Sequence, residues 1–529
     1  MLRPTFLGFE TAKRGLAVSQ KSLDIVGNNL SNIDTAGYTR QRLDTTSVAP
    51  SAYSTRVATS RVGLTGQGVD ALGVSQMRDA FLDKRFRDEY SQASYNTQVT
   101  SILTDLEAAL GDADNVAEGG DVFMKSLEQL FITLNDFSSD PTSVPHANLV
   151  LSAFNTAAQT LQTLNHKVEQ VGEQQKYDLN INVNNVNAIL EQIAHLNETI
   201  RQDATVLQDP DNEYFRPNEL LDQRNLLLDE LASYGDISVK DMSDGTVTVT
   251  FGGKVAVSGG KFDGINLFED SATGVVTLHW KSTGDQVGLT AGGLKGFTDF
   301  LNGRGANVQN PGETSKQGVL YYKDRLDTLA RTLANVVNRI VPEMEEDPDA
   351  APDDPDKMKV KLDENGSVIY KELLSAKQAD GTTNSNLPVT AANISISDKW
   401  LQNGADYFVY HPGSKENNYA LQIITALNEA DTQFVSYGET FTGTFSEYLI
   451  DYTGKIGSDT SFYEGRQQVT SEVADDLLDR RDEVSAVSEN EETVNMMTFQ
   501  KSFNAISRVM TTLDDLLETL INRTGRVGL

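Results

Sequence analysis

The sequence predicts a mainly α fold with inserted β structure: a long coiled-coil-like helical rod, built from both termini, that carries two outward, mainly β domains. Three observations lead to this prediction. Apolar or small residues recur in alternating steps of three and four near both ends of the chain. A longer pattern of the same kind fills residues 146–203. Short β-branched runs between glycine turns appear in the middle of the chain.

The two terminal patterns predict helices that pair with each other. No proline lies between Pro4 and Pro50 or after Pro412, so long helices are permitted at both ends. The same residues could instead pack into the core of their own molecule, as amphipathic helices usually do. At the N-terminal end the pattern comprises Phe9, Ala12, Leu16, Ser19, Leu23, Val26, Leu30 and Ile33. At the C-terminal end it comprises Met496, Phe499, Phe503, Ile506, Met510, Leu513, Leu517 and Leu520.

The remaining segments divide into a helical rod and two insertions. Further helices are expected at 74–110, 121–137, 217–233, 318–341 and 465–485. The first insertion, 236–285, contains β-branched runs with the hairpin signals Asp244-Gly245, Gly252-Gly253 and Gly259-Gly260. The second, 342–440, opens with an acidic, proline-rich linker. We therefore expect a terminal helical domain (1–44 with 495–529), a rod (45–235 with 286–341 and 441–494) and the two insertions.

Charge is distributed unevenly along the chain, whose formal net charge is -32. Residues 1–44 carry six basic and four acidic side chains and residues 495–529 carry four and three, so the ends sum to +3 and the middle carries -35. Such a field argues against nucleic acid and anionic membranes as partners. Neither a signal peptide nor a transmembrane run is recognisable, and the absence of cysteine excludes disulfides.

No residue pattern typical of catalysis, of a cofactor or of a metal site was found. The five histidines lack the paired spacing of a zinc site. The acidic run from Glu343 to Asp356 is interrupted by prolines and lacks the spacing of a calcium-binding loop. Gly63, Gly66 and Gly68 match no phosphate-binding motif. We therefore expect a protein without cofactors that is not an enzyme.

The most specific motif follows the N-terminal pattern. Residues 28–42 read NNLSNIDTAGYTRQR: a helix end rich in asparagine, a turn with a glycine that can adopt positive φ, and an extended aromatic and basic segment. This motif resembles the signature of flagellar axial proteins, the family of rod, hook and hook-associated proteins, with Ala36 where proline is common. The residues that carry the resemblance are Asn28, Asn29, Leu30, Asn32, Gly37, Tyr38, Arg40 and Gln41.

Within that family, Gly37 to Gln41 is similar to the hook-associated form, because hook and rod proteins more often have phenylalanine and lysine after the glycine. Further matching segments follow in order along the chain, whereas nothing in 342–440 could be aligned. These segments are 68–74, 78–82, 218–224, 481–485 and 491–503.

The resemblance implies a structural protein of the bacterial flagellum that supports motility and forms the junction layer between hook and filament. Terminal helices of neighbouring subunits would pack around a central export channel, and the middle would project outward. The implied partners are the hook protein, a second junction protein, further copies in a ring, and an export chaperone at the C-terminal helix. The implied location is extracellular, after type III export without a cleaved signal. We expect the termini to be disordered in the free chain and to fold on assembly.

The residues that would carry subunit assembly are the apolar members of the two terminal patterns. They are Phe9, Leu16, Leu23, Val26, Leu30, Ile33, Phe499, Phe503, Ile506, Met510, Leu513, Leu517 and Leu520.

Three alternatives stay open at this point. One is a hook or distal-rod subunit, which differs mainly in the Tyr38 to Gln41 pattern and in the 146–203 helix. Another is a secreted hydrolase seated in 342–440, although that segment has only His411 as a histidine and no GxSxG motif. The third is a cytoplasmic coiled-coil adaptor, which leaves the asparagine-rich turn unexplained.

Overall fold

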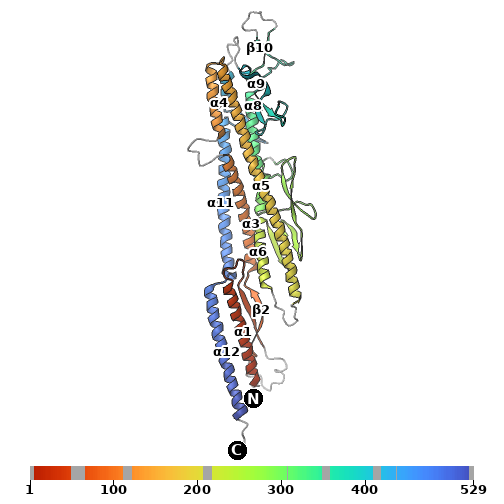
Figure 1. Ribbon diagram of the computed structural model, residues 1–529, viewed down its shortest axis with the longest axis vertical. Coiled ribbons are helices and arrows are strands. Elements are labelled where there is room, and N and C mark those ends of the chain that lie inside the picture. The colour runs from red at the N-terminus through yellow and green to blue at the C-terminus, as the bar shows by residue number, and fades with distance from the viewer. Residues whose placement is uncertain are drawn as a thin grey trace, which may run out of the picture.

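The computed structural model describes residues 5–48, 66–110, 122–206, 217–306, 308–347, 358–408, 419–436 and 438–523. Long helices run along an elongated molecule, and both ends of the chain lie at the same end of it (Figure 1). Small β-sheets lie against the helices on one side (Figure 1). The predicted mainly α fold with inserted β elements is confirmed.

The terminal unit comprises two long helices and a β-ribbon. Helix α1 (Thr5–Ser31) lies beside α12 (Glu489–Arg523), and strands β1 (Gln41–Ser47) and β2 (Val69–Gln76) pair antiparallel next to α1 (Figure 1). The register of the ribbon shifts between Asp44 and Thr45, which marks a β-bulge or irregularity there.

The rod is built from helices far apart in sequence. Helix α3 (Ala80–Leu110) packs along α11 (Phe445–Ser485), and α4 (Val122–Ser139) packs against α5 (Val144–Val206). The whole predicted 146–203 pattern lies in α5, which spans 63 residues and has Pro145 in its first turn, where a missing N–H is tolerated. Three shorter helices complete the rod: α6 (Asn218–Tyr234), α7 (Gly293–Leu301) and α8 (Val319–Val337).

The first group of strands forms two antiparallel sheets against α5. One has the order β3 (Ile237–Asp241), β4 (Val247–Phe251), β5 (Lys254–Ser258), β6 (Lys261–Phe262), and the other pairs β7 (Ile265–Glu269) with β8 (Val276–Trp280). In β4 and β8 every second residue is buried, as expected for strands with one face on a core. Phe251 and Trp280 meet edge to face in that core.

The second group of elements lies between α8 and α11 and mixes short strands with short helices. Trp400 is its buried centre and contacts Phe154 of α5 and Phe408. Its strands are β9 (Met344–Glu346), β10 (Met358–Val360), β11 (Leu374–Lys377), β12 (Thr383–Asn384), β13 (Ile394–Ile396), β14 (Gln433–Ser436) and β15 (Glu439–Thr442). Its helices are α9 (Asp398–Asn403), the 3₁₀-helix η2 (Gly404–Tyr407) and α10 (Tyr419–Leu427). Pro348, Pro352 and Pro355 of the predicted linker lie outside the described residues.

In the described part of the chain, five asparagines join extended segments to helices in the same way. In each case the side-chain amide donates to the carbonyl and accepts from the N–H of one residue, so the amide takes the place of a neighbouring strand. Asn197 of α5, for example, donates to the Val247 carbonyl at 2.9 Å and accepts from its N–H at 3.1 Å. The pairs are Asn29 with Gln41, Asn187 with Ile265, Asn197 with Val247, Asn302 with Val276, and Asn338 with Leu374.

Several predicted helix boundaries were wrong. Helix α1 ends at Ser31, where the Asn32 side chain donates to the Asn28 carbonyl, so Ile33 lies outside the helix and is 40% exposed. Residues 74–76, predicted as helix, pair with β1 as part of β2. Helix α11 begins at Phe445 rather than 465, because Thr444 and Glu447 form a capping box. Helix α12 begins at Glu489, seven residues before Met496, the first member of the predicted C-terminal pattern.

Candidate assembly surface

Helices α1 and α12 pack antiparallel through small residues of α1. A side chain added at Gly8 would lie 3.1 Å from Leu513, and one added at Gly15 would lie 2.9 Å from Ile506. Asn29, further along α1, contacts Glu492, near the start of α12. The contacts therefore advance by seven residues or multiples of seven in opposite directions, as in an antiparallel coiled coil. Between Gly8 and Ser31, the buried positions of α1 are Ala12, Gly15, Ser19, Ser22, Val26 and Asn29.

The predicted pattern on α12 corresponds to its partly buried side. Ile506 and Leu513 contact α1, and Phe499, Phe503, Met510 and Leu517 are partly buried at the same helical spacing. Leu520, near the end of α12, is 53% exposed.

On α1, half of the positions predicted to face α12 lie one residue C-terminal to the positions that do face it. Val26 is buried, but Phe9, Leu16, Leu23 and Leu30 are only partly buried, and each directly follows a position that faces α12. The contact face uses Gly8, Gly15, Ser22 and Asn29 instead. The predicted pattern assigns these positions to larger apolar residues, whereas a repeat of small residues seven apart in the sequence indicates this face.

The motif residues form a hydrogen-bonded cluster around Asn29 at the end of α1. The Asn29 side-chain amide donates to the Gln41 carbonyl and accepts from the Gln41 N–H, both at 3.0 Å. It also donates to the Glu492 carboxylate at 3.2 Å. The Tyr38 hydroxyl donates to Asn29 Oδ1 at 2.9 Å and accepts from Asn28 Nδ2 at 3.2 Å. Burial, with Asp222 close by, raises the pKa of Tyr38, so its hydroxyl stays protonated.

Arg40 extends this cluster to α12. Its guanidinium lies 2.9 Å from the Glu492 carboxylate and 2.6 Å from the Glu491 carboxylate. The backbone N–H of Arg40 donates to the Ser485 carbonyl at the end of α11. Glu492 is only 1% exposed, so Arg40 and Asn29 replace most of the water that would otherwise contact its carboxylate. Sequence reasoning missed Glu492, although it lies in a segment that carries the resemblance. Gly37, with φ of 76°, forms the turn before these residues, and a side chain there would lie 3.3 Å from Leu226 of α6.

A second polar cluster connects the β-ribbon to the rod. Gln76 donates to Asp222 of α6 at 2.7 Å, and Asn218 donates to the Val74 carbonyl at 3.3 Å. Burial raises the pKa of Asp222 to about 6, against the opposing effect of its Thr39 hydrogen bonds. Deeper in the rod, Asp229 of α6 pairs with Arg87 of α3 and Arg481 of α11, each at 2.6 Å. The terminal unit is thus attached to the rod through polar contacts.

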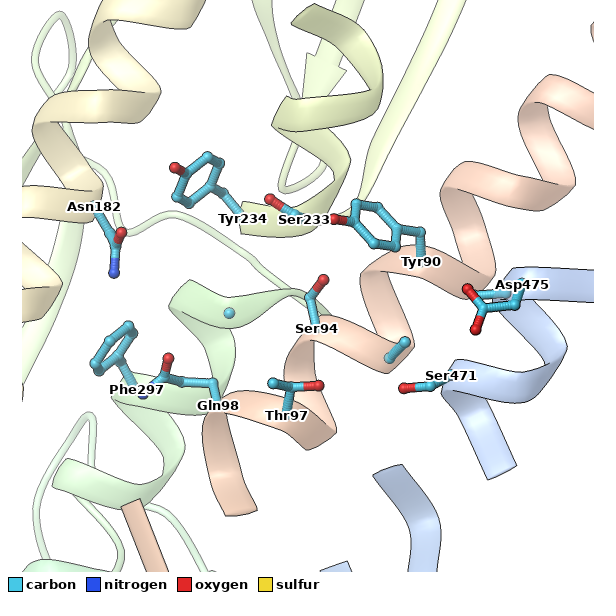
Figure 2. Close-up of a pocket in the computed structure, with 13 residues that line it drawn as sticks. Tyr90, Ser94, Thr97, Gln98, Asn182, Ser233, Tyr234, Phe297, Ser471 and Asp475 are labelled. Carbon is cyan, nitrogen blue, oxygen red and sulfur yellow. The ribbon is translucent and has the colours of Figure 1, made fainter. Parts of the chain in front are cut away.

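A cavity of about 340 Å³ lies among α3, α5, α6, α7 and α11 (Figure 2). Hydroxyl and amide groups such as Tyr90, Ser94, Thr97 and Asn182 line it, and Asp475 is its one carboxylate. None of the lining residues is a histidine, lysine or cysteine. Within the described parts of the chain, no three histidine or acidic side chains gather as a metal site, and no helix is long and apolar enough to cross a membrane.

Models of three protein families match the chain. Residues 111–342 match the helical domain of the flagellar hook-associated protein FlgK. Residues 9–39 match the flagella basal body rod protein family, and residues 480–523 match the C-terminal region of the flagellar basal body rod FlgEFG proteins. The end segments therefore resemble rod proteins as well, and the middle segment is what distinguishes the hook-associated family.

Relatives named flagellar hook-associated protein 1 are similar to this chain. The one from Bacillus subtilis is 28% identical over 99% of both chains. The one from Salmonella typhimurium is 29% identical over 45% of this chain and 40% of its own length. The solved structure of the flagellar hook junction protein FlgK from Burkholderia pseudomallei is 14% identical, with a TM-score of 0.50, and covers 77% of this chain and all of that one. This last similarity concerns the fold.

Proposed function

The chain belongs to the family of flagellar hook-associated proteins, structural components of the hook–filament junction, and from this premise we propose how it assembles there. Helices α1 and α12 form the inner assembly domain, and the rod with its two insertions projects outward. The observation that carries this proposal is the motif cluster, in which Asn29 and Arg40 hold Glu492 and thereby fix the two ends of the chain as one unit.

The distribution of charge supports the same division into an inner assembly domain and an outward rod. The ends of the chain sum to +3, whereas the remainder carries -35. Copies that approach one another through α1 and α12 therefore avoid the repulsion that their acidic middles would produce at short range. The acidic middle suits a surface that stays in water. The proposed domain boundaries are those predicted from the sequence, 1–44 with 495–529 for the inner domain, except that the inner domain also takes in the start of α12 from Glu489.

The proposed partners are those of a junction layer: the hook protein below, a second junction protein above, and further copies of the chain in a ring. An export chaperone is proposed to bind α12 before assembly, when its apolar side is available. The protein is proposed to act outside the cell, after export without a cleaved signal, and to have no enzymatic activity.

Coupling of folding to assembly is also part of the proposal. A lone helix is only marginally stable in water, which favours such coupling. Because α1 and α12 pack on each other, each has a partner within the chain. The pair is nevertheless narrow and rich in glycine and serine, so we expect it to open readily in the free chain and to be held closed in the assembled layer.

The test is to add purified chain to isolated hooks and to image the hook tips by electron microscopy. The proposal predicts a new layer at the distal end that is absent when residues 1–44 are removed. A folded chain that binds no part of the hook would contradict the proposal and would favour the coiled-coil adaptor. A layer that forms equally well without residues 1–44 would show that assembly does not depend on α1.

A further inference from the structure

The turn that follows β10 carries an asparagine–glycine pair, Asn365-Gly366. Both residues are exposed, and a side chain added at Gly366 would have no neighbour within 4 Å. Gly366 has a φ of 82°, which glycine adopts without strain. The backbone N–H of Asn365 donates to the Asp363 carboxylate at 2.9 Å, but no described residue forms a hydrogen bond with the Asn365 side-chain amide. This side chain is therefore free to rotate.

An asparagine followed by glycine can lose ammonia without an enzyme. The backbone nitrogen of the glycine attacks Cγ of the asparagine, forms a C–N bond and gives its proton to water. The C–N bond of the side-chain amide breaks, and ammonia leaves a cyclic succinimide. Water then opens the ring at one of its two carbonyls, which yields aspartate or isoaspartate. Nothing is oxidised or reduced, and water is the one co-reactant. Glycine favours the attack because it has no Cβ to obstruct its nitrogen.

The chain has three asparagine–glycine pairs, all within the described residues, and their surroundings differ. Asn302 is 1% exposed, and its amide donates to the Val276 carbonyl and accepts from the Val276 N–H. Asn403 is exposed at the end of α9, but its amide donates to the Lys399 carbonyl at 2.7 Å. These contacts keep both side chains from turning toward the nitrogen of the next residue, whereas Asn365 has no such contact.

We propose that Asn365 is a site of spontaneous deamidation, at which the folded chain converts to a mixture of aspartate and isoaspartate while Asn302 and Asn403 stay intact. The N–H of Gly366 donates to the Asp363 carbonyl at 3.0 Å. Because every residue from 362 to 368 is exposed, water competes for this bond and frees the nitrogen for attack. The inference does not depend on the proposed function.

Conversion changes both the charge and the backbone of the turn. Aspartate at this position adds a carboxylate beside the exposed acidic residues Asp363 and Glu364. Isoaspartate also inserts a methylene group into the main chain, where Asp363 accepts from the N–H groups of Asn365 and Ser367 at 2.9 and 2.8 Å. Strand β10 lies at the end of the molecule away from both chain termini (Figure 1), so the change is remote from α1 and α12.

The first arm of the test incubates the full chain in mildly alkaline buffer, which favours loss of the proton from the attacking nitrogen. Peptide mass spectrometry follows each pair, and an isoaspartyl methyltransferase identifies the isoaspartate product. Conversion at Asn365 should be at least tenfold faster than at Asn302 or Asn403, because the two protected amides cannot reach the nitrogen. In concentrated urea all three pairs should convert at similar rates, since the unfolded chain holds none of them.

The second arm changes the amide itself. Asn365→Gln keeps an amide at this exposed position but lengthens the side chain by one methylene, so ring closure should slow at least tenfold. The folded chain should then form little isoaspartate. The matched control is Asn403→Gln, which makes the same change at another asparagine–glycine pair and should leave conversion at Asn365 unchanged.

Three outcomes decide the inference. Selective conversion at Asn365 in the folded chain, with similar conversion of all three pairs in urea, supports it. An Asn365 that stays intact in the folded chain and converts in urea overturns it. Equal conversion of the three pairs in the folded chain also overturns it, because the contacts of Asn302 and Asn403 would then protect neither residue.

Discussion

The guanidinium of Arg40 lies 2.9 Å from the carboxylate of Glu492, although the two residues come from opposite ends of the chain. Arg40 immediately precedes β1, and Glu492 lies in the first turn of α12. Asn29, at the end of α1, donates to the same carboxylate. A short N-terminal motif therefore determines where the C-terminal helix begins to pack, which explains why motif and helix act as one unit in this account.

Replacing Glu492 by glutamine should loosen this unit. Glutamine removes the buried charge that Arg40 and Asn29 contact, while Arg40 keeps its exposed partner Glu491, so we expect the α1–α12 contact to lose about 2 kcal/mol. Hydrogen exchange of α1 and α12 amides should accelerate accordingly. The control is Glu491→Gln. The Glu491 carboxylate also pairs with Arg40, but its side chain is 62% exposed, so this substitution should change the free energy of unfolding by about 0.5 kcal/mol or less. Equal effects of the two variants would contradict a special role for Glu492.

A large side chain at Gly15 should separate α1 from α12. The added Cβ would lie 2.9 Å from Ile506, so Gly15→Leu should destabilise the pair by about 1–3 kcal/mol through overpacking. Gly27, on the same helix, has no neighbour within 4 Å of an added Cβ, so Gly27→Leu should be neutral or stabilising. Thermal unfolding followed by helical circular dichroism compares the two. Partial rescue of Gly15→Leu by Ile506→Ala is expected, and its absence would argue against this packing.

Asn197→Ala should release the first β-sheet from α5. The substitution leaves the N–H and carbonyl of Val247 without these partners and removes an acceptor from Arg224, which lies 3.1 Å away. Unsatisfied buried groups of this kind cost about 1–3 kcal/mol each. Limited proteolysis should then cleave within 237–262 before the rod, whereas His195→Ala, at an exposed position of α5, should behave as the unmodified chain does. Unchanged cleavage would show that the sheet does not depend on this amide.

The joint between the ribbon and the rod should respond to pH through Asp222. Its pKa is raised by burial to about 6 from an ordinary 3.8, so its protonated form is favoured in the folded state. Its contribution to the free energy of unfolding is therefore full below pH 3.8 and is lost as the pH rises through 6, by about 2–3 kcal/mol. The free energy of unfolding of the unmodified chain, taken relative to that of Asp222→Asn, should therefore fall by that amount between pH 4 and pH 7. Asp88→Asn, at an exposed position of α3, should show no such trend.

The sequence predicted the elements better than their contacts. The 146–203 pattern predicted α5 because burial of one helical face imposes a period that local sequence reveals. The capping box at Thr444 and Glu447 was readable but overlooked. The five asparagine contacts were not predictable, because each joins residues whose proximity is decided by tertiary packing. The small-residue face of α1 was misassigned because apolar size was taken as the measure of burial.

The central claim is that α1 and α12 form the surface through which the chain joins the junction layer. Hydrogen–deuterium exchange of the free chain and of the chain bound to isolated hooks tests it most directly. The account predicts that protection rises in 5–31 and 489–523 on binding, while the sheets between 237 and 280 exchange as in the free chain. Protection that rises in those sheets and not in the terminal helices would contradict it.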